Sequence, residues 1–168
     1  MSTIDPLTTA GHLAHRGEPC WFAGNLFEFL IPSDSTGGQM SVFRCTARGG
    51  FGPPRHVHTR EDEVFHVVEG DVCFEIDGRR QAAGPGTTVW MPRGVPHGFR
   101  VESPVARMLG IITPGDYEHL FRALGVPAQT RELPPLDGLE LDVATLVTEM
   151  AARGTHVVGP PIGVGSEA

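Results

Sequence analysis

Residues 50–70, GFGPPRHVHTREDEVFHVVEG, hold several potential metal-binding side chains in one short stretch. His56 and His58 are separated by one residue, so on an extended strand both imidazoles point to the same face. Residues 59–62, TRED, can form a turn, after which Glu63 opens the next strand. Because neighbouring strands lie only about 5 Å apart, the Glu63 carboxylate can reach a metal ion that the two imidazoles hold.

Side chains of the strand that Glu63 opens alternate between two faces. If Glu63 faces inward, Phe65 and Val67 share its face, whereas Val64 and His66 point away. His66 is therefore not expected to bind the metal, although it lies close to the other histidines in the sequence.

A second stretch, residues 86–101 (GTTVWMPRGVPHGFRV), supplies a third imidazole. Pro92, Gly94 and Pro96 favour a tight turn that delivers His97 at the start of a strand. Three imidazole nitrogens and one carboxylate oxygen suit one divalent transition metal and leave one or two coordination positions open. Iron, nickel, manganese, cobalt, copper and zinc all accept such donors, so the sequence does not identify the metal. The predicted ligands are His56, His58, Glu63 and His97.

An apolar pocket is predicted beside this metal site. Phe65 and Val67 share the face of Glu63, and Phe99 shares the face of His97. A mostly apolar pocket suits a planar aromatic small molecule.

The rest of the chain indicates an all-β domain. Strand-forming runs follow one another roughly every eight to twelve residues between positions 21 and 112, which is typical of a sandwich or barrel. The chain contains 22 glycines and 15 prolines, which provide turns between short strands. Asp77-Gly78, after the alternating run at residues 72–76, is a strong hairpin signal.

Two helices are predicted after the last strand. Tyr117, Leu120, Phe121 and Leu124 have helical spacing after a start at Thr113-Pro114, and a second helix is predicted over Asp142–Arg153. Both apolar faces are expected to pack on the β-structure. The length of 168 residues fits one domain, with a core at about residues 40–112 and a helical extension at about residues 113–168.

Composition excludes several classes of partner. The formal net charge of -7 argues against nucleic-acid binding, which requires a basic face. No run approaches the roughly 20 apolar residues of a membrane helix, and the N-terminus lacks the pattern of a secretion signal. Cys20, Cys45 and Cys73 lie far apart without CxxC pairing, so we expect reduced thiols and a cytoplasmic protein.

The spacing of both motifs resembles that of the cupin superfamily. The first is Gly50-x5-His56-x-His58-x4-Glu63-x6-Gly70. The second is Gly86-x5-Pro92-x-Gly94-x2-His97, and it departs from the family at Val101, where an asparagine is usual. The resemblance implies a cupin double-stranded β-helix, or jelly-roll barrel, with a metal at its mouth. The usual asparagine is not a metal ligand, so the departure leaves the metal prediction intact.

Residues after 112 resemble the tails of single-domain cupins similar to quercetin 2,3-dioxygenase. In those flavonol dioxygenases the glutamate ligand also takes the proton of the substrate hydroxyl, a role that falls here to Glu63. The predicted function is metal-dependent dioxygenation of an enol or phenol. The alternatives are a non-oxidative metal enzyme (an isomerase, decarboxylase or cyclase) and a cupin that binds a small molecule without turnover.

The N-terminal strands suggest self-association. Apolar residues there exceed the obvious needs of one small barrel, so we expect a homodimer in which these strands meet a second copy. The residues concerned are Trp21, Phe22, Leu26, Phe27 and Phe29.

Overall fold

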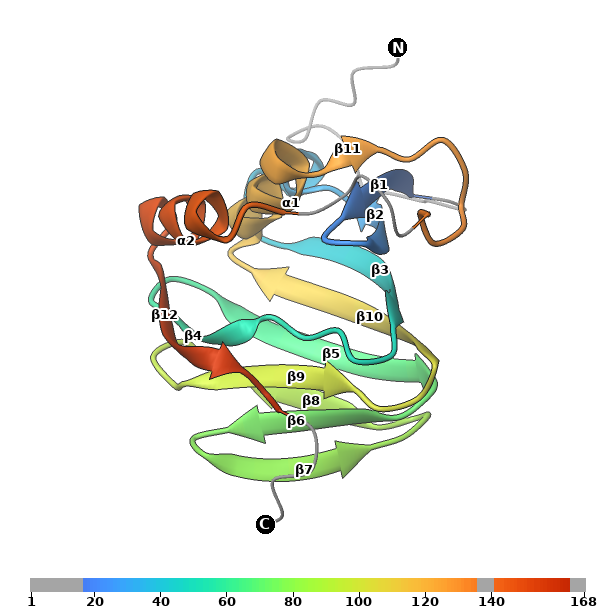
Figure 1. The fold of residues 1–168 in the computed structure, drawn as a ribbon. Helices are drawn as coiled ribbons and strands as arrows, with labels where there is room; N and C mark the ends of the chain where they lie inside the picture. Colours follow the sequence, from blue (N-terminus) through green and yellow to red (C-terminus); the bar gives the residue numbers. More distant parts are fainter. Residues whose placement is uncertain (1–16, 136–140, 164–168) are drawn as a thin grey trace.

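Two β-sheets and two helices make up the protein in a computed structural model that describes residues 17–135 and 141–163 (Figure 1). The strands of the first sheet are β1 (Glu18–Phe22), β2 (Asn25–Ile31), β3 (Ser41–Arg48), β5 (Asp62–Glu69), β8 (Thr88–Met91), β10 (Val105–Thr113) and β11 (Val126–Pro127). Those of the second are β4 (Pro54–His58), β6 (Val72–Ile76), β7 (Arg79–Ala83), β9 (His97–Val101) and β12 (Thr155–Pro161). The helical elements are η1 (Ser33–Thr36), η2 (Gly115–Tyr117), α1 (Glu118–Leu124) and α2 (Val143–Ala152).

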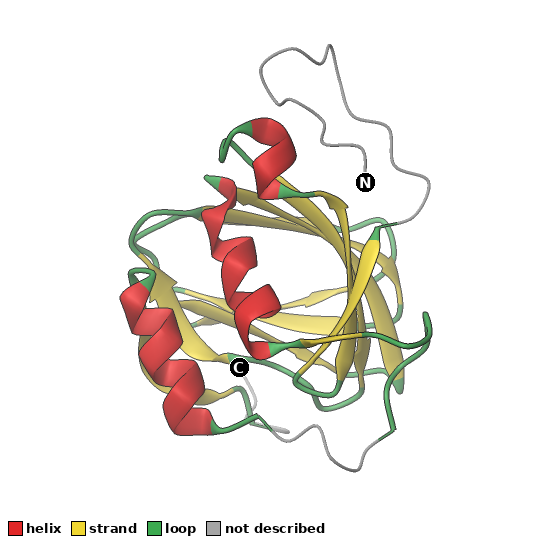
Figure 2. Cartoon of the chain, turned by 90° about the horizontal axis from the view of Figure 1, so that it is seen from above, coloured by secondary structure: helices red, strands yellow, loops and turns green. Residues whose placement is uncertain are grey.

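The sheets have the strand orders β11-β1-β2-β3-β10-β5-β8 and β12-β4-β9-β6-β7, and their inward-facing side chains share one hydrophobic core. The ladders of the described strands stay within these two sheets, as in a jelly roll. Both helices lie at the same end of the sheets (Figures 1 and 2). The predicted all-β jelly roll with two C-terminal helices is therefore confirmed.

Local sequence signals explain several boundaries. Asp77 and Gly78 both have positive φ, at 51° and 72°, as a two-residue hairpin between β6 and β7 requires. The second predicted helix begins as expected, with the Asp142 side chain accepting a bond from the Thr145 N–H. The first begins later than expected: Thr113 ends β10, and its hydroxyl donates to the Gln39 carbonyl instead of capping a helix.

The strands that carry the histidines are held from both sides. β4 lies between β12 and β9, in a register that pairs His56 with His97. The turn before β9 is attached to β4, because the Gly94 N–H donates to the His58 carbonyl at 2.7 Å. Gly94 has φ of 79°, a conformation that glycine adopts without a steric penalty. The two imidazole-bearing segments are thus fixed relative to each other by backbone bonds.

Val101 occupies the position where the resembled family has asparagine. Its side chain is fully buried in the core. Its N–H donates to the Phe51 carbonyl, and its carbonyl accepts from the Gly50 N–H, both at 2.9 Å. These backbone bonds hold the loop before β4 without a side-chain amide at position 101.

The apolar residues of the N-terminal strands belong mainly to the chain's own core. Four of the five residues predicted to meet a second copy are buried: Phe22, Leu26, Phe27 and Phe29. The fifth, Trp21, is half-buried, and its indole N–H donates to the Glu132 carbonyl at 2.9 Å. α1 explains this, because its Phe121 ring packs 4.8 Å from Phe27. The four buried side chains therefore pack in the chain's own core, and the homodimer itself stays a prediction that light scattering at micromolar concentration would test.

None of the helices in the described part of the chain is both long and apolar enough to span a membrane.

Candidate metal centre

The structure brings together all four side chains that the sequence predicts as ligands. One potential ligand atom from each of His56, His58, Glu63 and His97 lies within 4.8 Å of all the others, and all four residues are buried. They come from β4, β5 and β9 and therefore from both sheets. The spacing argument placed each of them on the correct face of its strand.

Distances in the cluster are those of converging donors. The Glu63 Oε1 lies 3.7 Å from the His58 Nε2, and its Oε2 lies 3.5 Å from the His97 Nε2. The three imidazole ring centroids are 4.7 to 5.5 Å apart. One carboxylate thus faces two ring nitrogens at once.

The opposite ring nitrogen of each histidine is held by a hydrogen bond. The Nδ1 of His56 lies 2.7 Å from the Pro54 carbonyl, and that of His97 lies 2.9 Å from the Val95 carbonyl. A carbonyl only accepts, so each Nδ1 carries the proton and each Nε2 is left with a free lone pair. Such bonds fix both the tautomer and the ring orientation of metal-binding histidines.

Two buried atoms test whether a metal fits this site. The Nε2 atoms of His58 and His97 are buried without any hydrogen-bond partner. Buried polar atoms are seldom left unsatisfied, and an unpaired imidazole nitrogen beside a carboxylate is a donor set for a transition metal. The residues present therefore fit a divalent transition metal, and the four donors could hold it.

Burial and mutual interaction set the ionisation of these groups. Burial lowers the pKa of His56 to about 4, against the pull of Glu63. Burial opposes the charge of Glu63, but the imidazoles, His58 foremost, lower its pKa to about 2. For His58, burial is outweighed by the Glu63 and Glu61 carboxylates, so its pKa is raised. His56 is neutral and Glu63 ionised at neutral pH, which are the forms that bind metal.

A cavity of about 310 Å³ opens beside the cluster, and His56 and Glu63 form part of its wall. Phe65 and Phe99 line it, as the alternation of β5 and β9 indicates. Val67 does not line it, although its side chain points inward. Val67 pairs with Met108 and is completely buried, so its side chain packs in the hydrophobic core instead of lining the cavity.

His66 lies on the opposite face of β5 from the cluster, as its parity predicts. Its Nδ1 is 2.8 Å from the Thr88 hydroxyl in an exposed setting. We expect His66→Ala to retain the bound metal content of the wild-type protein, as measured by elemental analysis after dialysis. A large loss of metal in this variant would mean that the site has been assigned to the wrong face.

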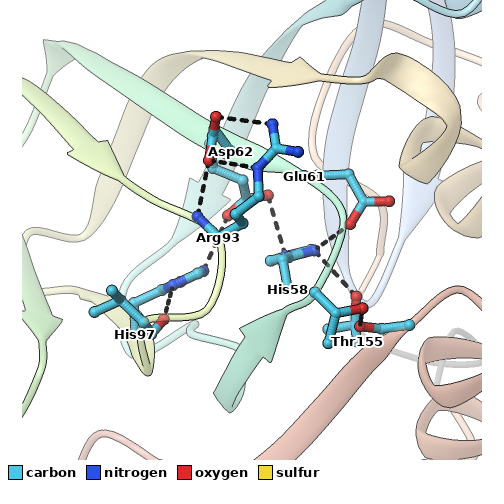
Figure 3. A network of polar contacts seen from close by, with 10 residues as sticks. His58, Glu61, Asp62, Arg93, His97 and Thr155 are labelled. Carbon is cyan, nitrogen blue, oxygen red and sulfur yellow. Dashed lines mark hydrogen bonds and ion pairs between the residues drawn. The ribbon is translucent and has the colours of Figure 1, made fainter.

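Sequence reasoning did not find the residues that surround His58. Its Nδ1 lies 3.2 Å from the Glu61 Oε2 and 3.0 Å from the Thr155 hydroxyl, both buried (Figure 3). Thr155 also hydrogen-bonds Tyr117, whose ring lies 4.4 Å from the His58 ring. Glu61 sits in a turn, where alternation says nothing, and Thr155 belongs to β12, which the sequence did not reveal as a strand.

Loss of the Thr155 hydroxyl should remove one of the hydrogen bonds that orient the His58 ring. Removal of an outer partner of a metal-binding histidine typically costs about 10–100-fold in metal affinity. Because Glu61 remains, we expect Thr155→Val to weaken binding by about 10-fold, the lower end of that range, in a competition titration with a chelator. Thr88→Val is the matched control, since it removes a threonine hydroxyl from His66 instead. Equal affinities in both variants would contradict a role for Thr155.

Comparisons with known proteins agree with this architecture. Residues 43–112 match the family model described as "Cupin domain". Over 119 residues, 71% of the chain, the sequence is 28% identical to a quercetin 2,3-dioxygenase of Bacillus subtilis (strain 168). Over 110 residues it is 26% identical to a quercetin 2,3-dioxygenase of Aspergillus japonicus. The aligned regions amount to 35% and 31% of these two relatives, so the chain spans about a third of their length.

Solved structures show the same fold at low sequence identity. An RmlC-like cupin from Shewanella frigidimarina superposes with a TM-score of 0.52 at 18% identity, over 66% of this chain and 93% of that one. Pac13, a nucleoside dehydratase, superposes with a TM-score of 0.52 at 16% identity, over 67% and 88%. The motifs and the jelly roll agree with the matched family model, and residues 43–112 form a cupin domain.

Proposed function

We propose that the chain is a metal-dependent dioxygenase that acts on an enol or phenol of the flavonol kind. The observation that carries the proposal is that two of the four donors, His56 and Glu63, form part of the wall of an aromatic-lined cavity. A substrate in that cavity would meet His56 and Glu63 directly. Both curated relatives are quercetin 2,3-dioxygenases, which supports this chemistry for the part of them that the chain matches.

His56, His58, Glu63 and His97 would hold the metal. A bound divalent metal supplies a positive charge that lowers the pKa of a substrate hydroxyl beside it. The Glu63 carboxylate would accept the proton of that hydroxyl, because it is ionised and lies at the cavity wall. Phe65 and Phe99 would exclude water from the resulting anion.

The overall reaction balances without any further reactant. The substrate anion supplies the electrons and dioxygen is the oxidant. Both oxygen atoms enter the organic product as a carbon–carbon bond of the substrate is cleaved. The proton held by Glu63 then returns to the product, which regenerates the carboxylate.

Oxygen uptake by the metal-loaded protein tests this function directly. The protein would be loaded in turn with each candidate metal and screened with enols and phenols in an oxygen electrode, with products identified by mass spectrometry. We expect metal-dependent uptake of one dioxygen for each substrate consumed. Conversion of substrate without oxygen uptake would indicate a non-oxidative cupin enzyme. Binding without conversion would indicate a small-molecule-binding cupin.

A further inference from the structure

The cavity wall beside the metal site is a continuous aromatic surface. Seven of the nine phenylalanines in the chain line it. Neighbouring rings in this series have centroids 4.8 to 6.0 Å apart, from Phe22 at one end, through Phe43 and Phe65, to Phe51 at the other. A wall of phenyl rings favours a planar aromatic ligand, because ring contacts add to the gain from apolar burial.

Polar side chains are confined to one region of this cavity. Among the described residues that line it, only His56, Glu63 and Tyr117 have a side-chain nitrogen or oxygen. The first two belong to the metal cluster. The Tyr117 hydroxyl is hydrogen-bonded to Thr155, and its ring packs against His58, a third member of that cluster.

The arginines of the two motifs add no polar group to the cavity wall. Arg93 holds the Asp62 carboxylate through two side-chain bonds of 3.1 and 3.0 Å. Arg55 donates to the Glu75 carboxylate and to the Pro160 carbonyl. Neither arginine lines the cavity.

Apolar side chains of α2 and of the residue preceding its cap form another part of the cavity wall. Leu141, Leu146 and Met150 line the cavity there. Both helices lie at this end of the sheets (Figure 2). A hydroxyl placed against these side chains would lose its water without gaining a hydrogen bond, which costs about 5–150-fold in affinity for each group.

From this distribution we infer the substrate class: a planar aromatic enol or phenol whose polar atoms all lie at the reacting end. Its remaining rings carry no hydroxyl or charged group. This inference rests on the proposed function. It disfavours sugars and nucleosides, which would bury several hydroxyls against phenylalanine rings.

Two flavonols that differ only in remote hydroxyls provide the test. 3-Hydroxyflavone carries only the reacting hydroxyl, whereas quercetin has further hydroxyls on both outer ring systems. With the metal-loaded full chain, we expect kcat/KM for 3-hydroxyflavone to exceed that for quercetin by at least about 5-fold, from one unpaired hydroxyl. Equal or faster turnover of quercetin would overturn the inference and leave the proposed function standing. Turnover of neither flavonol, while another enol is oxidised, would also overturn only the inference, and oxidation of no enol or phenol would overturn both.

A pair of variants on α2 shows whether the cavity wall sets the preference. Leu146→Gln adds a hydrogen-bonding group to the wall, whereas Val147→Gln adds the same group on the exposed side of the same helix. We expect Leu146→Gln to shift the kcat/KM ratio toward quercetin by about 2- to 12-fold, the value of one hydrogen bond. Val147→Gln should leave the ratio unchanged. A ratio that moves equally in both variants, or in neither, would show that the wall does not set the preference; metal content and thermal unfolding verify that each variant is folded.

Discussion

Replacement of Glu63 by glutamine is expected to reduce turnover of an enol substrate by about 10²–10⁴-fold, the usual value of a general base. Glutamine keeps the shape of the side chain and one oxygen donor, but it cannot take a proton at neutral pH. The three histidines remain, so most of the metal should be retained. The measurements are kcat from oxygen uptake and metal content from elemental analysis of the same sample.

Asp62→Asn is the matched control for this variant. Asp62 immediately precedes Glu63 in the chain, but its carboxylate binds Arg93 instead of facing the histidines (Figure 3). Its replacement should leave kcat within a few-fold of the wild-type value, on the order of the change that loss of an exposed ion pair produces. A Glu63→Gln protein that holds metal and consumes oxygen at the normal rate would remove Glu63 from the mechanism.

Replacement of His97 by alanine should abolish stable metal binding. The substitution removes one of the four donors to the metal. Loss of a residue that only hydrogen-bonds a metal-binding histidine already lowers metal affinity by about 10–100-fold, so loss of a donor should lower it further. We therefore expect a decrease of more than 100-fold in affinity, on the scale of that estimate. His58→Ala should behave in the same way, whereas the His66→Ala protein serves as the control.

Thermal unfolding provides an independent measurement for the His97 variant. A ligand at 100 times its Kd stabilises the folded state by about 2.7 kcal/mol, so added metal should raise the Tm of the wild-type protein. The same metal concentration should not change the Tm of His97→Ala. Equal shifts in the two proteins would place the bound metal elsewhere.

The candidate ligands could be predicted from the sequence because the direction of a side chain on a strand depends only on its position along that strand. A strand alternates its faces, so the positions of His56, His58 and Glu63 decide their direction before the tertiary structure is known. The same rule separated His66 from the cluster. It also selected Phe65 and Phe99 for the cavity wall.

The alternation of side chains along a strand did not predict which inward-facing residues line the cavity and which are buried in the core. Val67 has the same parity as Phe65, yet only Phe65 lines the cavity, because the Val67 side chain is completely buried in the hydrophobic core. The N-terminal phenylalanines were predicted to meet a second copy, since the packing of α1 against them was not visible in the sequence. Thr155 was missed for a similar reason, because 97 residues separate it from His58.

Because β12 follows β4 late in the chain, the two neighbouring strands are synthesised at different times. Thr155 follows His58 by 97 residues. Because a ribosome adds about 5–20 residues per second, Thr155 is synthesised about 5–20 s after His58. Until then β4 lacks the neighbour on its outer side that β12 provides in the finished sheet. The motif histidines of a nascent chain therefore reach solvent before their final anchor exists. The surroundings of His58 are complete only after β12 has been made.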